Sequence, residues 1–122
     1  MSDLLAILQK IEAKPGLYLG RASISDLFMF IIGYRTAREE LGIETTEAEL
    51  DFYGEFQPWL QKRLKITTSN SWAKIIELGC SSEKEAFERF FRLFDEFLQD
   101  DDRAITQSAT SIENSAEPLE VQ

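Results

Sequence analysis

The side chains best suited to chemistry form an acidic run between residues 39 and 55. This run contains no lysine or arginine and holds seven carboxylates: Glu39, Glu40, Glu44, Glu47, Glu49, Asp51 and Glu55. A surface of one charge sign could cover a basic cleft on a partner, such as the active site of a nuclease, by imitating phosphate charge. Opposite charge raises the association rate of two proteins more than their final affinity. The alternative is a solvated helix face that keeps the chain soluble.

Two aromatic residues lie in or beside the acidic run and could anchor a partner. Tyr53 is inside the run, and Trp59 follows Pro58 near Lys62 and Arg63. Tryptophan and tyrosine are enriched among interface hot spots, although both could instead pack in the core. The predicted partner-binding residues are Glu44, Glu47, Glu49, Asp51, Tyr53, Glu55 and Trp59. The second tryptophan, Trp72, precedes an apolar pair and is predicted to be a core residue.

The side chains that most enzymes use are scarce in this chain. It contains no histidine and a single cysteine, Cys80, so Ser-His and Cys-His nucleophile pairs and the usual zinc ligand sets are excluded. Carboxylates alone could hold calcium or magnesium, but no EF-hand loop occurs. We therefore expect no catalytic residue, no cofactor and no metal site. Cys80 is interpreted as a small buried hydrophobic residue.

Charge and hydropathy limit the partners. The net charge of −9 argues against nucleic acid, which proteins bind through clustered Lys and Arg, and favours a basic protein. The most apolar run, residues 27–32, is shorter than the roughly 18 residues of a membrane span. The first residues include Asp3 where a signal peptide is positively charged. We expect a cytoplasmic protein without membrane contact, and the sequence leaves its oligomeric state open.

Apolar residues recur at helical spacing in five segments, at about residues 3–13, 23–41, 46–64, 72–78 and 82–99. This pattern predicts a compact all-α bundle of about five helices over residues 1–99. The last segment carries five phenylalanines and should form the spine of the core. Gly33 is expected to permit close helix contact, and Pro58 to break or kink its helix. Residues 100–122 are acidic, polar and without aromatics, which predicts a disordered tail.

A short segment, Ile11-Glu12-Ala13-Lys14-Pro15-Gly16-Leu17-Tyr18-Leu19-Gly20, resembles a stretch near the nucleotide site of the DNA gyrase B subunit and its ATPase relatives. The resemblance implies a nucleotide-binding fragment. The Glu…Asn helix motif and the Asp-x-Gly-x-Gly loop that those ATPases also require do not occur in this chain. The alternative is a tight Pro-Gly turn whose Tyr18 and leucines pack into the core.

A broader resemblance covers residues 10–97. The order of its features is similar to small bacterial immunity proteins encoded beside polymorphic or contact-dependent toxins. These features are the Pro15–Gly20 motif, Ser23-Ile24, Leu27, Phe30-Ile31-Ile32-Gly33-Tyr34, Ala37, Phe56, Trp59, Ser71-Trp72, Ile75-Ile76, Glu85-Ala86-Phe87 and Phe90-Phe91. The resemblance implies a protein that neutralises a cognate toxin by occluding it. A generic interaction or regulatory module without a toxin is the alternative.

Overall fold

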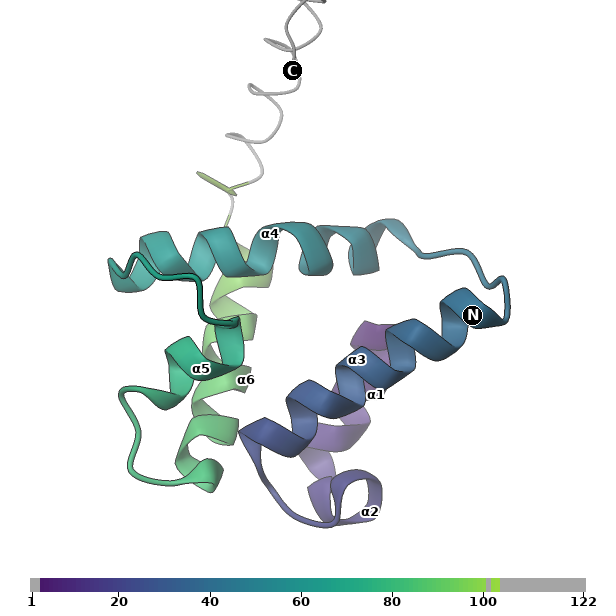
Figure 1. Cartoon of the computed structure of the whole chain (residues 1–122), viewed down its shortest axis with the longest axis horizontal. Helices are drawn as coiled ribbons and strands as arrows, with labels where there is room; N and C mark the ends of the chain where they lie inside the picture. The colour runs from purple at the N-terminus through teal and green to yellow at the C-terminus, as the bar shows by residue number, and fades with distance from the viewer. Residues whose placement is uncertain (1–2, 101, 104–122) are drawn as a thin grey trace, which may run out of the picture.

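The computed structural model describes residues 3–100, 102 and 103, and these residues form an all-α fold (Figure 1). Its helices are α1 (Leu4–Ala13), α2 (Pro15–Leu19), α3 (Ile24–Glu40), α4 (Glu47–Leu64), α5 (Trp72–Glu77) and α6 (Glu83–Gln99). The predicted fold class is confirmed. Within the described part of the chain, no helix is both long and apolar enough to cross a lipid bilayer.

Five of the helices begin at a polar residue whose side chain caps the first turn. Each capping oxygen accepts a hydrogen bond from the backbone N–H three residues later, which satisfies a donor that the helix itself cannot pair. The capping residues are Asp3, Ser23, Thr46, Ser71 and Ser82. Sequence patterns therefore located these helix starts to within a residue or two.

The core is built around α6, as its phenylalanine pattern predicted. Phe90 and Phe97 of α6 are fully buried and meet Phe56 of α4, which is also fully buried. Trp72 lies against the ring of Phe90 with centroids 4.9 Å apart and is only 9% exposed. The prediction that Trp72 is a core residue is confirmed.

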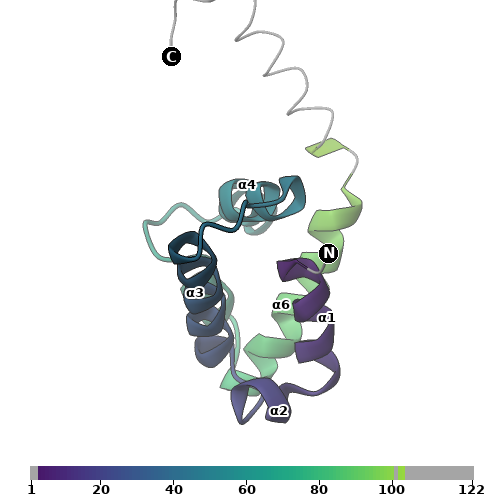
Figure 2. The same cartoon turned by 90° about the vertical axis from the view of Figure 1, so that its right-hand side faces the viewer.

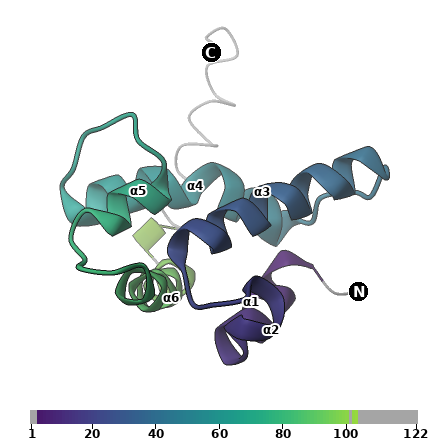
Figure 3. The same cartoon turned by 60° about the horizontal axis from the view of Figure 1, so that its bottom comes forward.

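α4 lies across one end of the other helices. In Figure 2, α3 stands on one side and α1 with α6 on the other, while α4 crosses above them and α2 lies at the opposite end. Figure 3 shows α5 next to α6 and α1 next to α2. The C-terminal end of α3 and the N-terminal end of α4 meet at one corner of the molecule, joined by residues 41–46 (Figure 1).

Three local predictions need correction. The Pro-Gly stretch, expected to be a turn, forms the short helix α2, because proline is well suited to the first helical position. Its Tyr18 and Leu19 do pack against the core, whereas Leu17 is 73% exposed. Gly33 makes no close contact, since a Cβ built there meets nothing within 4 Å. α4 continues through Pro58 instead of breaking.

The folded region also extends beyond the predicted boundary at residue 99. Asp100 and Arg103 contact the body of the domain through hydrogen bonds to Trp59 and Asp51. The predicted disordered tail therefore does not begin at residue 100. The rest of that prediction, residue 101 and residues 104–122, lies outside the described residues.

Candidate protein-binding face

α4 turns apolar side chains inward and carboxylates outward. Phe52, Phe56 and Leu60 are buried, while Glu47, Asp51 and Glu55 follow one another at i, i+4 and i+8. This spacing places the three carboxylates in one row on the other side of the helix. Leu50, Gly54 and Pro58 are exposed beside the row, and we call these six residues together the α4 face.

Glu49 does not belong to this face, which corrects its prediction as a partner-binding residue. Its side chain is only 1% exposed. One carboxylate oxygen accepts a hydrogen bond from the Leu4 N–H at 2.8 Å. The other accepts from the Thr46 N–H at 2.9 Å and from the Arg38 guanidinium at 3.0 Å. Glu49 therefore joins α1, α3 and α4 internally and is not available to a partner.

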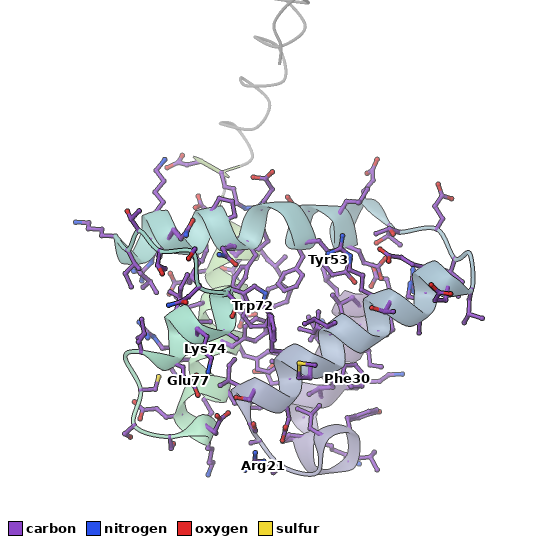
Figure 4. The ribbon with its side chains drawn as sticks, in the orientation of Figure 1. Arg21, Phe30, Tyr53, Trp72, Lys74 and Glu77 are labelled. Carbon is purple, nitrogen blue, oxygen red and sulfur yellow. The ribbon has the colours of Figure 1, made fainter. Side chains whose placement is uncertain are left out.

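Tyr53 also points away from the α4 face. Figure 4 shows it on the side of α4 that faces α3, where the Arg35 guanidinium lies 4.4 Å from the centre of its ring. Burial, reinforced by the negative charge of Glu49, raises the pKa of the Tyr53 phenol to about 12. Tyr53 is half-buried and keeps its proton at neutral pH. The structure assigns it to the contact between α3 and α4.

Trp59 is half-buried at the far end of α4. Its indole packs on Phe56 and Phe97, with ring centroids 6.0 and 5.6 Å away. Its Nε1–H donates to a carboxylate oxygen of Asp100 at 2.7 Å. That hydrogen bond is the main cause that lowers the pKa of Asp100 below its usual value. One edge of Trp59 therefore belongs to the core and the other lies at the surface.

Arg103 secures the chain after α6 against α4. Its Nη1 donates to both carboxylate oxygens of Asp51, at 2.8 and 3.0 Å, and its Nε donates to the Phe97 carbonyl at 3.0 Å. Its guanidinium also stacks over the Phe97 ring at 3.8 Å. The charge of Asp51 is thus partly neutralised. The composition of residues 100–122 gave no reason to expect this contact between Arg103 and Asp51.

We call Asp100, Asp102 and Arg103, which follow α6, the C-terminal return. A surface groove of about 440 Å³ lies between α4 and these residues. It is lined by Glu55, Pro58, Trp59, Lys62, Arg63, Asp100, Asp102 and Arg103. Two predicted binding residues, Glu55 and Trp59, therefore share one hollow. Because it holds three acids and three bases, the groove has no dominant charge, and it contributes shape and an indole edge to the α4 face.

Glu44 and Glu47 are the most accessible of the predicted carboxylates. Both are exposed at the corner where α3 ends and α4 begins. Among the described residues, no ion pair involves Glu44, Glu47 or Glu55. Within residues 3–100, 102 and 103, no three or more acidic or cysteine side chains lie close enough together to hold a metal ion.

No protein-family model, curated protein or solved structure matches this chain. Of the seven predicted residues, Asp51, Glu55 and Trp59 lie together along the outer part of α4, with Glu47 at the start of the same row and Glu44 just before it. Glu49 and Tyr53 lie elsewhere.

Sequence reasoning missed a second carboxylate that holds helices together. Glu83 accepts hydrogen bonds from the Ser23 hydroxyl and from the N–H and hydroxyl of Ser25, all at 2.8–2.9 Å. These bonds, the one from the Ser25 N–H first, lower the pKa of Glu83 from 4.5 to about 2. Glu83 thereby ties the start of α6 to the start of α3, and no local pattern indicated this partner.

Proposed function

We propose that this chain is an inhibitor-like binding protein whose α4 face docks on a basic partner protein. The observation that carries the proposal is the row Glu47, Asp51 and Glu55 with exposed Glu44 before it. Three of these four carboxylates, Glu44, Glu47 and Glu55, form no ion pair within the described residues. The chemistry available to such a face is recognition, with no bond made or broken.

The composition of the α4 face is costly for the helix itself. Like charges at i, i+4 destabilise a helix by roughly 0.2–0.5 kcal/mol per pair, and the row contains two such pairs, Glu47–Asp51 and Asp51–Glu55. Arg103 relieves only Asp51. A basic partner would relieve the whole row, because its positive charge would face all three carboxylates.

The face also has apolar contact area between its charges. Leu50 is 57% exposed beside Glu47 and Asp51, and Pro58 and Trp59 border the groove at the other end. Interfaces typically surround a few apolar or aromatic anchors with polar residues. Leu50 and the Trp59 edge are suited to be those anchors, while the carboxylates orient the partner.

The nature of the partner comes from the resemblance to immunity proteins of toxin systems. Under that resemblance, the chain would neutralise a toxin such as a nuclease by covering a cleft that ordinarily binds phosphate groups. A row of carboxylates along a rigid helix supports this mechanism, because it presents negative charge at regular intervals. A regulatory interaction module with a different basic partner would use the same face.

The test is to identify the genes on either side of this chain in its native host and, where one encodes a toxin-like protein, to co-express the chain with that product; a neighbourhood without such a gene favours the regulatory module instead. A triple reversal, Glu44→Lys with Glu47→Lys and Glu55→Lys, is compared with a matched control, Glu12→Lys with Glu88→Lys and Asp95→Lys. All three control positions are exposed on other helices. Because each variant replaces three acidic residues with lysines, the two variants have the same net charge. We expect wild type and control to bind the toxin domain and restore growth, and the triple reversal to lose both. Equal protection by the two variants would refute the α4 face, and no protection by wild type would refute the toxin assignment.

A further inference from the structure

α3 carries two apolar side chains that the fold leaves exposed on the side away from its buried residues. Ile24, Leu27 and Ile31 of this helix are buried, yet Met29 and Ile32 are 61% and 41% exposed. A surface helix ordinarily has one apolar side and one polar side. In Figures 1 and 2, α3 is the outermost helix on its side of the molecule.

The exposed residues form a continuous stripe. Met29, Gly33, Thr36 and Glu40 recur at i, i+4, i+7 and i+11, all are exposed, and Ile32 lies beside them. We call these five residues the α3 stripe. With a rise of 1.5 Å per residue, the stripe is about 17 Å long, which matches about three turns of a helix packed alongside it.

Gly33 lies in the middle of the stripe without a reason inside the fold. Its added Cβ would meet nothing within 4 Å, and its φ is not positive. Glycine in a helix interior costs roughly 0.5–1 kcal/mol relative to alanine. A glycine does, however, let another backbone approach closely, so Gly33 gives the stripe a shallow point at which a second helix could rest.

The end of the stripe carries charge where the helix disfavours it. Glu39 and Glu40 occupy the last turn of α3, and carboxylates at a helix C-terminus oppose the helix dipole. Arg35 lies 3.5 Å from Glu39, but no ion pair of the described residues involves Glu40. Basic side chains of a bound partner would offset both the charge and the dipole.

We propose that the α3 stripe binds an amphipathic helix of a partner protein. The apolar side of the partner helix packs on Met29, Ile32 and Gly33. Basic residues at one end of the partner helix face Glu39 and Glu40. This charge requirement disfavours the other occupants. A second copy of the chain carries the same net charge of −9, residues 104–122 contain only acids among their charged residues, and anionic lipid surfaces would be repelled. The proposal stands on α3 alone and does not rest on the α4 face.

The probe is a synthetic helix of about four turns with Leu and Ala on one side and Lys at one end. A second peptide keeps the apolar side and replaces each Lys with Glu. Binding to the full chain is followed by NMR through the methyl groups of Met29 and Ile32. The blocking variant is Gly33→Arg, which has open space for its side chain and removes a helix-disfavouring residue. Its matched control is Leu98→Arg, at a 44% exposed leucine on α6.

We expect the Lys peptide to shift the Met29 and Ile32 signals and to bind about tenfold more tightly than the Glu peptide, as complementary charge requires. Gly33→Arg should lose at least about tenfold in affinity while Leu98→Arg keeps it. Unmoved Met29 and Ile32 signals, or equal binding of the two peptides, would overturn the proposal. Signal changes confined to α4 would also overturn it while leaving the α4 face intact, so the two proposals fail separately.

Discussion

Replacing Glu49 with glutamine should destabilise the domain far more than the same change two residues earlier. Glu49 receives three hydrogen bonds, from the Leu4 N–H, the Thr46 N–H and the Arg38 guanidinium. Glutamine has nearly the same volume but only one accepting oxygen. Its NH₂ group would therefore face at least one of these donors, and Arg38 would lose its counter-charge.

The magnitude follows from burial. Breaking a buried ion pair by removing one partner costs about 3–5 kcal/mol when the other charge stays fully buried. The Glu49 side chain is 1% exposed and that of Arg38 is 13% exposed, so water can partly solvate the Arg38 charge that remains. We expect a loss of about 2–4 kcal/mol in the free energy of unfolding, a large share of the roughly 5–15 kcal/mol available to a domain.

Equilibrium urea unfolding followed by circular dichroism measures this loss. Glu47→Gln is the control, because Glu47 is exposed and should change stability by less than about 0.5 kcal/mol. Arg38→Met in the Glu49→Gln background should recover part of the loss, since it removes the unpaired charge. A Glu49→Gln protein as stable as Glu47→Gln would refute the interpretation that Glu49 joins α1, α3 and α4.

Three further predictions concern stability. The pKa of Glu83 falls from 4.5 to about 2 on folding, so the stability that its charged form provides is present above pH 4.5 and is lost as the pH falls to 2. The melting temperature of wild type should therefore exceed that of Glu83→Gln at pH 6 and approach it at pH 2. A difference in melting temperature that does not change with pH would contradict this. Gly33→Ala should raise the free energy of unfolding by about 0.5–1 kcal/mol. A lower melting temperature of the variant in a thermal unfolding experiment would instead show that Gly33 has a contact partner. Arg103→Ala should cost about 1 kcal/mol and shift Trp59 fluorescence to longer wavelength relative to Lys62→Ala, whereas unchanged emission would mean that the C-terminal return does not cover the indole.

Local patterns predicted the fold well because its helices depend on local chemistry. Capping residues such as Ser23 and Thr46 satisfy backbone donors within their own segment, and the phenylalanine period of α6 determines which side is buried. The predicted helix break at Pro58 was wrong, because α4 continues through it. The carbonyl that a proline ring would meet belongs to the residue four positions earlier, which is Gly54, and its lack of a side chain leaves the backbone room to adjust.

The candidate site was predicted less well, because a charge run in sequence is not a face in space. Residues two apart in a helix do not face each other, so Glu49 lies on the opposite side of α4 from Glu47 and Asp51. The sequence Thr46-Glu47-Ala48-Glu49 has the form of a capping box, in which the side chain of Glu49 reaches back to the cap, and the structure contains that bond. The contact of Arg103 with Asp51 joins residues 52 positions apart, and no local pattern could reveal it.

The measurement that tests the α4 face most directly is the association rate constant with the identified partner as a function of salt concentration. If the row Glu47, Asp51 and Glu55 steers a basic partner, the rate constant for wild type should fall steeply between low and physiological ionic strength. For Glu47→Lys with Glu55→Lys it should be at least about tenfold lower at low salt and nearly independent of salt. A wild-type rate constant that does not change with salt, or one that the double reversal leaves intact, would contradict the account.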